Sequence, residues 1–189
     1  MKLAVIVDSD GTIARWQFDA LKEVVSDGHT INLLAVAKGN SYKSPRKLKY
    51  FFYYLFAILS RYKLAQLSRV AISDLGVQVD QQIDFVRQVN GIWEEIPSSI
   101  LPQFSDSDVV IKFGMGLLRN PHLIPAKHGV LSYHHGNPSA YRGRPAGFWE
   151  SLSSDKTMGV IVQSLSNTLD AGAIKSIGYS RVNQTSYRK

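Results

Sequence analysis

The stretch MKLAVIVDSDGTIARWQFDALKEVVSDGHTINLLAVAKG, residues 1–39, decides the fold class. Its residues 3–7 form a continuous apolar run, which is typical of a strand buried on both faces. After the next turn, apolar residues recur at helical spacing from Ala14 onward, and Gly28 can end that helix in a left-handed cap. Residues 31–37 predict a second buried strand. A strand, a helix and a strand at this spacing indicate a parallel sheet with right-handed crossovers.

The same alternation resumes in the second half of the chain. The segments with strand or helix character are VVIKF at 109–113, GVLSY at 129–133, PAGFWESL at 145–152, MGVIVQSL at 158–165 and AIKSIGYS at 173–180. The third of these predicts a helix with Pro in its first turn, and the others predict short strands. We therefore expect an α/β fold, a Rossmann-like open and mostly parallel sheet flanked by helices, with residues 1–189 forming a single domain.

The composition fits one globular domain, with 189 residues of which 44% are hydrophobic. The chain has no cysteine, which excludes disulfides, thiolate chemistry and cysteine metal sites. This agrees with a reducing compartment, and we expect a cytoplasmic protein. The N-terminal apolar run is short and meets two aspartates, so it predicts a strand and not a signal peptide. The chain ends at SYRK soon after its last predicted strand, which is compatible with one domain of a longer protein.

Residues 41–67 interrupt the alternation with an aromatic and basic insertion. Its apolar residues follow helical spacing, but the opposite face is apolar as well, and the apolar run is far shorter than the roughly 20 residues that span a bilayer. Such a helix is expected to be buried, to lie at an oligomer interface or to lie on a membrane. We expect burial or a homo-oligomer interface, and membrane-surface contact through 43–63 stays open as the alternative.

The net charge of +7 comes partly from this insertion. The basic residues concerned are Lys43, Arg46, Lys47, Lys49, Arg61 and Lys63. A basic, aromatic span can bind nucleic acid, an anionic membrane or a phosphorylated substrate, but a solvated helix flank has the same composition. Charge alone therefore names no partner, and we expect no nucleic acid.

The segment SYHHGNPSAYRG, residues 132–143, carries the first candidate chemistry. An apolar strand ends there in His134 and His135, and glycine and proline residues then interrupt regular structure. In open α/β sheets, ligands bind outside the carboxyl ends of the strands. A histidine at such an end can donate a hydrogen bond to a developing oxyanion or move a proton near neutral pH. An isolated loop histidine is usually structural, but two neighbours in this setting favour a catalytic role.

The segment resembles the signature of the folate-dependent formyltransferases, in which a strand ends Asn-x-His and a Ser/Pro-containing loop and a Gly follow. With the signature His on His134, the closing Gly falls on Gly143 without a gap. The family's downstream Asp-x-Gly turn is similar to Asp170-Ala171-Gly172. The segment DVVIKFGMGLL at 108–118 resembles the strand and loop beside the folate. The resemblance covers most of the chain except the insertion.

This resemblance implies a transferase of one-carbon metabolism, with 10-formyltetrahydrofolate as co-substrate and a small-molecule amine as acceptor. His134 would stabilise the oxyanion of a tetrahedral intermediate, and Asp170 would orient His134 and help to move the proton of the amine. No metal is required. The residues implied to contact the folate are Phe113, Gly114, Met115, Gly116, Leu117, Leu118, Gly143 and Leu169.

One position departs from the signature, because Ser132 replaces the family's Asn two residues before the histidine. A serine hydroxyl is shorter than an amide and offers a single donor. Asn137 and His135 are candidate substitutes. Loss of one oxyanion donor costs about 10²–10³ in rate in other enzymes. A binding module that keeps the formyltransferase fold without turnover is therefore an alternative.

The segment VIVDSDGT at 5–12 supports a rival hypothesis, because it resembles the first motif of haloacid-dehalogenase-type phosphatases. Asp8 would then be the nucleophile and Asp10 the general acid/base, with Mg²⁺ on the phosphate. That family also needs a later strand that ends in an acidic pair. Asp106 and Asp108 precede the strand at 109–113, so they belong to the wrong end. We favour a turn in which the aspartates cap helix amides.

The remaining patterns predict no cofactor or metal site. The Gly114–Gly116 segment lacks the third glycine and the acidic residue of a dinucleotide fingerprint. His122 and His128 show no zinc-type spacing. Family members formylate aminoacyl-tRNA, glycinamide ribonucleotide or nucleotide-linked amino sugars. Since no tRNA-binding domain is evident, we expect an amino sugar or a related small amine as the acceptor.

Overall fold

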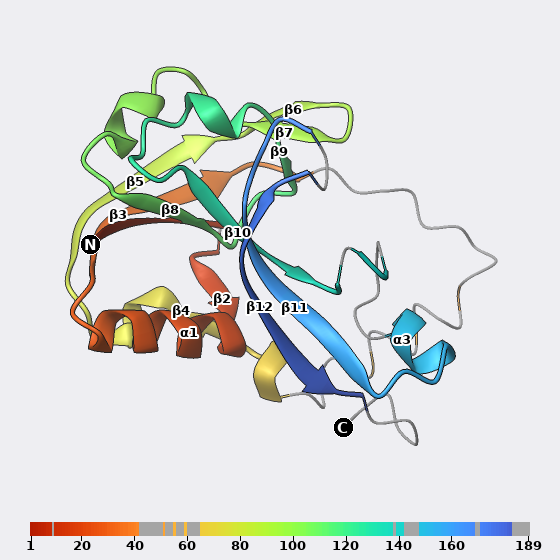
Figure 1. The fold of residues 1–189 in the computed structure, drawn as a ribbon. Coiled ribbons are helices and arrows are strands. Elements are labelled where there is room, and N and C mark those ends of the chain that lie inside the picture. The colour runs from red at the N-terminus through yellow and green to blue at the C-terminus, as the bar shows by residue number, and fades with distance from the viewer. Residues whose placement is uncertain are drawn as a thin grey trace.

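The computed structural model describes residues 1–8, 10–41, 51, 55, 59, 65–137, 139–141, 148–168 and 171–182. A seven-stranded sheet, in the order β12-β11-β10-β8-β1-β3-β5, forms its centre (Figure 1). Five strands are parallel: β1 (Lys2–Asp8), β3 (Thr30–Lys38), β5 (Val79–Val86), β8 (Val109–Lys112) and β10 (Val130–His135). Two antiparallel strands, β11 (Thr157–Ser164) and β12 (Ala173–Arg181), extend the sheet on the β10 side. The predicted open, mostly parallel sheet is confirmed.

The predicted strands all occur, but the strand β5 was missed. Half of the residues in its sequence VDQQIDFV are polar, and most of its residues are exposed. The strand forms the edge of the sheet beside β3, where side chains on both faces meet solvent. Hydrophobic periodicity therefore gave no signal there, because an edge strand needs little burial.

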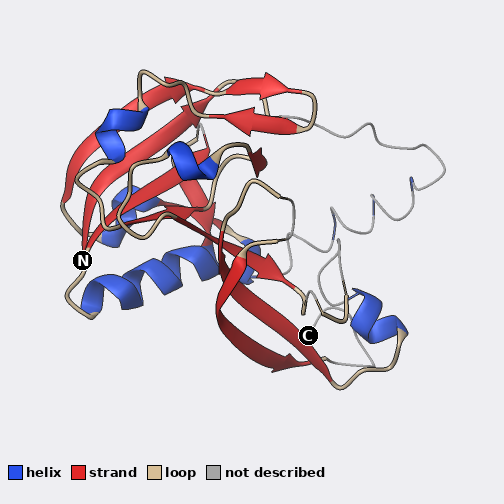
Figure 2. Ribbon diagram, turned by 45° about the horizontal axis from the view of Figure 1, so that its top comes forward, coloured by secondary structure: helices blue, strands red, loops and turns tan. Residues whose placement is uncertain are grey.

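The helix α1 (Arg15–Ser26) covers one face of the sheet, as Figures 1 and 2 show. Its buried side chains Phe18 and Leu21 pack in a cluster with Val5 and Val7 of β1. The helix ends as predicted at Gly28, whose φ is +86° and whose N–H donates to the Val25 carbonyl.

The start of α1 differs from the prediction that aspartates cap its amides. A short strand β2 (Thr12–Ala14) lies between the turn and the helix and pairs with β4 (Arg69–Ala71). The Asp10 carboxylate accepts from the Thr12 N–H, at 3.1 Å, and so serves the turn before β2. The Gln17 side chain accepts the Ala14 N–H at the helix start, at 2.8 Å. The capping prediction was wrong because β2 displaces the aspartates from the first helical turn.

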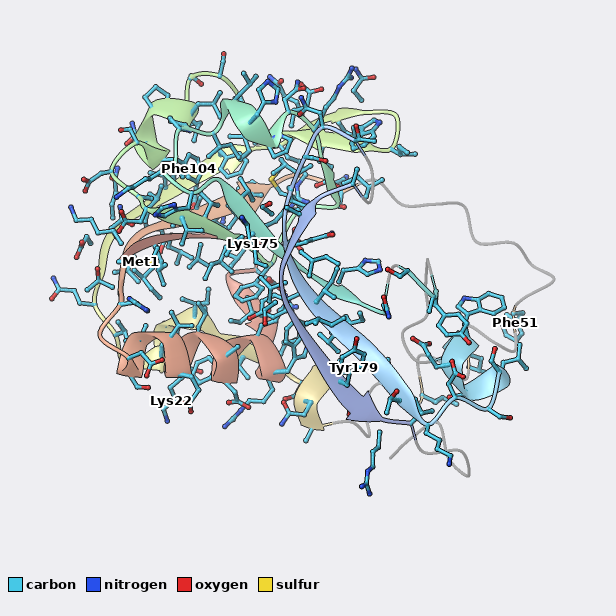
Figure 3. The ribbon with its side chains drawn as sticks, viewed as in Figure 1. Met1, Lys22, Phe51, Phe104, Lys175 and Tyr179 are labelled. Carbon is cyan, nitrogen blue, oxygen red and sulfur yellow. The ribbon has the colours of Figure 1, made fainter. Side chains whose placement is uncertain are left out.

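The opposite face of the sheet is covered by short elements. A small sheet consists of β6 (Gln88–Asn90), β7 (Trp93–Glu95) and β9 (Leu117–Leu118), and the 3₁₀ turns are η4 (Leu101–Phe104) and η5 (Pro121–Leu123). The second core cluster lies under them and includes Phe104, which is 0% exposed (Figure 3). The elements η2 (Ala65–Leu67) and η3 (Ile72–Leu75) contact α1, and Ile72 of η3 belongs to the same core cluster as Phe18 and Leu21. The short helix α3 (Phe148–Leu152) precedes β11.

The predictions for two further segments fall partly outside the described residues. The predicted helix at 145–152 is present as α3 from Phe148, while 142–147 are not described. Between residues 42 and 64, only Phe51, Leu55 and Leu59 are described; their backbone is helical and their side chains are 53%, 41% and 56% exposed. Burial within the chain is thus not observed at these three positions. No helix among the described residues is long and apolar enough to cross a membrane.

Gly114 provides a test of how closely the central strands are packed. A Cβ at this position would lie 2.3 Å from the carbonyl carbon of Val7. The β1 backbone is paired with β3 and β8 on its two sides and has no room to move. We expect Gly114→Ala to lower the free energy of unfolding by about 3 kcal/mol, measured by urea denaturation.

Gly178→Ala is the matched control, because its Cβ would meet only the Val160 carbonyl oxygen, at 4.0 Å. We expect that variant to stay within about 1 kcal/mol of the parent. Equal stabilities of the two variants would contradict the close approach at Gly114.

Candidate active site

The carboxyl ends of the five parallel strands meet at one edge of the sheet. The residues brought there are Asp8, Lys38, Arg87, Lys112 and His134, each at or near the end of its strand. This is the edge at which open α/β sheets bind ligands. The two predicted elements at 109–113 and 129–133 are neighbours there, since β8 pairs with β10. The edge is therefore the candidate active site.

The side chains of β10 alternate between the two faces of the sheet. Tyr133 and His135 face α1, where their rings each lie 5.1 Å from the ring of Trp16, centroid to centroid. Burial raises the pKa of the Tyr133 hydroxyl. Ser132 and His134 consequently point to the other face, the side on which Val130 packs into the core. The alternation separates His135 from Ser132, which does not favour His135 as a replacement for the missing amide.

The loop after β10 brings backbone close to the His134 imidazole. Gly136 is buried, has a φ of +132° and donates its N–H to the Gly159 carbonyl at 2.8 Å. A Cβ on Gly136 would lie 3.7 Å from Nε2 of His134. A glycine is thus needed for the backbone conformation, and the ring of His134 lies directly against it.

Asn137, the other proposed substitute for the amide, is engaged locally. Its Oδ1 accepts the Ser139 N–H at 3.0 Å, and its carbonyl accepts the N–H groups of Ala140 and Tyr141. Such side-chain hydrogen bonds two residues along the chain define an Asx turn. The Asn137 carbonyl and amide oxygens therefore organise the loop beside His134.

The segment 113–118, predicted to line the folate, divides between the faces of the sheet. Phe113 stacks on Tyr133 with ring centroids 5.9 Å apart, on the α1 side. Met115 and Leu118 are buried in the opposite core cluster, whereas Gly116 and Leu117 are exposed. Gly114 is the residue pressed against β1. The segment is therefore a tight crossing over the end of β1.

Met115 has a left-handed backbone, with a φ of 62°, which is unusual for a residue with a side chain. Polar groups hold its peptide on both sides. Its N–H donates to Oδ1 of Asp8 at 3.1 Å, and its carbonyl accepts from Nζ of Lys112 at 3.0 Å. Strain of this kind persists only where the surroundings fix it, and it gathers at functional sites.

A buried arginine ties this segment to three strands. The side chain of Arg87 is 2% exposed and pairs with Asp8 at 2.8 Å and with the fully buried Glu94 at 2.9 Å. It also donates to the Ala37 carbonyl at the end of β3, at 2.6 Å. Glu94 in turn accepts the Gly116 N–H at 2.9 Å and the Ser41 hydroxyl. No sequence pattern predicts this network, because its members come from four separate segments.

The turn predicted to carry Asp170 lies between β11 and β12, as expected. Gly172 passes so close to β11 that a Cβ on it would lie 2.1 Å from the Ser164 carbonyl oxygen. The Ala171 N–H donates to the Thr168 carbonyl at 3.3 Å. Asp170 itself lies outside the described residues, as do Leu169 and Gly143.

The geometry does not fit the phosphatase hypothesis. Oδ1 of Asp8, the would-be nucleophile, accepts from Arg87 and from the Met115 amide. Asp106 and Asp108 bind Lys2 at the start of β1, which is the opposite edge of the sheet. No group of three or more metal-binding side chains occurs within the part of the chain that the structure describes.

Asp10, the other aspartate of that motif, also has a structural role. Burial raises the pKa of Asp10, but hydrogen bonds from Thr12 and the Arg69 guanidinium outweigh it and leave the pKa below its usual range. Asp10 is therefore held as a carboxylate, which does not suit a general acid.

Comparisons with solved structures define the class of fold. The phosphoribosylglycinamide formyltransferase from Anaplasma phagocytophilum matches all of this chain and 76% of its own, with a TM-score of 0.60 and 14% identity. Glycinamide ribonucleotide transformylase 1 from Symbiobacterium toebii matches 98% of this chain and 75% of its own, with a TM-score of 0.59 and 13% identity. The formyltetrahydrofolate deformylase from Burkholderia mallei ATCC 23344 matches 97% of this chain and 55% of its own, with a TM-score of 0.56 and 12% identity.

The chain therefore has the fold of the folate-dependent formyltransferases, as its sequence predicted. A scan of protein families and a search of curated proteins each found no match. The fold is thus established by structure alone.

Removal of the Arg87 charge tests the buried network. Arg87→Met leaves the Glu94 carboxylate buried without its cation, and we expect a loss of about 3–5 kcal/mol in the free energy of unfolding, measured with urea. Arg119→Met is the control, since that arginine pairs with Glu95 at 3.5 Å and the two side chains are 47% and 29% exposed. We expect it to cost less than about 1 kcal/mol.

A double variant separates charge burial from packing. Arg87→Met with Glu94→Gln removes both charges, and we expect it to be more stable than Arg87→Met alone. If the double variant is no more stable than the single one, the uncompensated carboxylate is not the cause of the loss.

Proposed function

We propose that this protein transfers the formyl group of 10-formyltetrahydrofolate to the amine of a small molecule. The observation that carries the proposal is the position of His134, at the carboxyl end of β10 in a chain whose whole fold matches formyl-transferring enzymes. The strained segment at 114–116, fixed by Asp8 and Glu94, supports it as a prearranged wall of the site.

In this mechanism, the neutral amine attacks the formyl carbon and a tetrahedral intermediate forms. His134 donates a hydrogen bond to the oxyanion, which stabilises the charge where it develops. Asp170 orients His134 and helps to move the proton from the attacking amine. For the folate, the resemblance implies contact with the segment 113–118, in which Gly116 and Leu117 are exposed. It also implies contact with Gly143 and Leu169, which lie outside the described residues.

The loop after β1 does not select the class of acceptor by its charge. It carries two carboxylates, Asp8 and Asp10, and each is paired with an arginine, Arg87 and Arg69 respectively. An amino sugar, the acceptor expected from the sequence, is therefore the first class to test, and the reaction would place the protein in one-carbon metabolism.

The formyl-transfer proposal is tested with His134→Ala. We expect calorimetry to show binding of 5-formyltetrahydrofolate, a stable analogue, to the parent protein. We expect the parent to release tetrahydrofolate from 10-formyltetrahydrofolate when an amino sugar is present. In His134→Ala, we expect kcat to be lower by about 10²–10⁴ while the fold stays intact.

His29→Ala is the matched control, because the imidazole of His29 lies at the opposite edge of the sheet. Its Nδ1 is 3.0 Å from the N-terminal amine of Met1. The variant should keep full activity. A fully active His134→Ala protein contradicts the mechanism. Folate binding without formylation of any amine would instead identify a binding module, and Mg²⁺-dependent phosphatase turnover lost in Asp8→Asn would replace the proposal altogether.

A further inference from the structure

Gln163 is a buried polar residue of β11 that lies directly across from Ser132. The two residues are register partners in the antiparallel pair of β10 and β11 (Figure 1). Gln163 is only 9% exposed, and its side-chain amide forms no hydrogen bond within the part of the chain that the structure describes. An unpaired amide at a buried position costs free energy, so its presence in a folded protein calls for an explanation.

Gln163 lies on the same face of the sheet as His134. Register partners share a face, and Ser132 comes two residues before His134 in β10. On that face Leu165, two residues after Gln163, packs on the core cluster that contains Val130 of β10. Gln163 and His134 are therefore diagonal neighbours on adjacent strands, about 7–8 Å apart, a distance that long side chains can bridge.

The amide of Gln163 also lies beside the turn predicted to carry Asp170. Its Oε1 would be 3.4 Å from a Cβ on Gly172, the glycine that closes that turn. The oxygen is the amide atom nearest to Gly172, so the NH₂ group, which is the donor, lies farther from it. Gln163 thus stands between β10 and the turn, the two segments whose side chains take part in the proposed transfer.

The other candidates for the missing amide donor are engaged elsewhere. His135 faces α1, and the Asn137 side chain organises its own loop. Ser132 itself has a single donor on a short side chain. Among the described residues of β10 and β11, Gln163 is the amide side chain on the face of His134.

We propose that Gln163 is a catalytic residue whose side-chain amide donates to the formyl oxygen, beside His134 and in place of the amide that Ser132 lacks. This inference rests on the proposed formyl transfer. A donor that is already in position stabilises the oxyanion without rearrangement when the charge develops. The amide missing from β10 is thereby supplied by β11, from the register position directly opposite.

The step is balanced without any further reactant. The lone pair of the acceptor nitrogen forms the new C–N bond, and the carbonyl π pair moves to the formyl oxygen, where Gln163 and His134 donate. The pair then returns, and the bond between carbon and the folate nitrogen breaks with its electrons on that nitrogen. That nitrogen takes up the proton that the attacking amine loses. The products are the formylated amine and tetrahydrofolate.

Two variants of similar size remove the donor. Gln163→Met keeps a side chain of similar volume without a polar hydrogen, and Gln163→Glu keeps the shape but has an acceptor in place of the NH₂ group. With 10-formyltetrahydrofolate and an amino sugar, we expect kcat to fall by about 10²–10³ in both variants. In Gln163→Met, KM for the folate and the Kd of 5-formyltetrahydrofolate should stay within about threefold, because the lost bond forms only in the transition state.

Two further measurements separate a catalytic role from a structural one. Adding Ser132→Asn to Gln163→Met supplies an amide donor from the opposing strand, and we expect it to restore kcat by at least about tenfold. Since the Gln163 amide has no hydrogen bond to lose, we expect the urea midpoint of Gln163→Met to equal or exceed that of the parent. Gln82→Met is the matched control, because Gln82 is an exposed glutamine of β5, at the far edge of the same sheet, and it should leave kcat unchanged.

The outcomes are distinguishable from failure of the proposed function. If the parent protein transfers formyl groups and Gln163→Met does so at the parent rate, the inference is overturned. A rise in KM with kcat unchanged overturns it as well. A lower urea midpoint without rescue by Ser132→Asn identifies a structural residue and has the same consequence. If the parent transfers no formyl group at all, the proposed function fails and the inference falls with it. Should Gln163→Met fail to fold, the kcat of Gln163→Glu decides the question.

Discussion

The buried guanidinium of Arg87 is the interaction on which the functional edge depends. One planar group follows β5, binds carbonyls at the end of β3, and pairs with carboxylates from β1 and β7. Those two carboxylates then accept the amides of Met115 and Gly116. The strand ends could not approach one another with these charges uncompensated, since an unpaired buried charge costs several kcal/mol. The network therefore fixes the crossing of residues 114–116 over β1, which shapes one side of the edge.

The side chains of adjacent residues in β10 lie on opposite faces of the sheet. Tyr133 and His135 contact Trp16 on the α1 side and complete an aromatic cluster with Phe113. His134 lies between them and faces the other side, against Gly136. A displacement of one residue along this strand would exchange the two faces. The packing of Trp16 thus holds the register that presents His134, so a hydrophobic contact of α1 has a consequence for chemistry on the opposite face.

The fold could be predicted from the sequence wherever strands are buried on both faces. The runs at 3–7 and 31–37 became β1 and β3, and Gly28 ended α1 as expected. The edge strand β5 was not predicted from hydrophobic periodicity, because its polar side chains are exposed to solvent. The position of His134 at the end of a strand could be predicted from its segment, but the pairing of Arg87 with Glu94 could not. Their partners lie far apart in the chain, and only the fold brings them together.

The charge in VVIK and the serine at Ser132 are two departures from a local rule, and they face each other across neighbouring strands. A sequence that contradicts its own pattern in one place is most often serving function there. Lys112 breaks the apolar character of β8 where that strand reaches the edge, and Ser132 shortens the side chain opposite it. Taken singly, Lys112 departs from the expected apolar strand, and Ser132 departs from the formyltransferase signature. Taken as a pair, they are register partners on β8 and β10, so two polar side chains stand side by side on one face of the sheet at the point where its buried strands end.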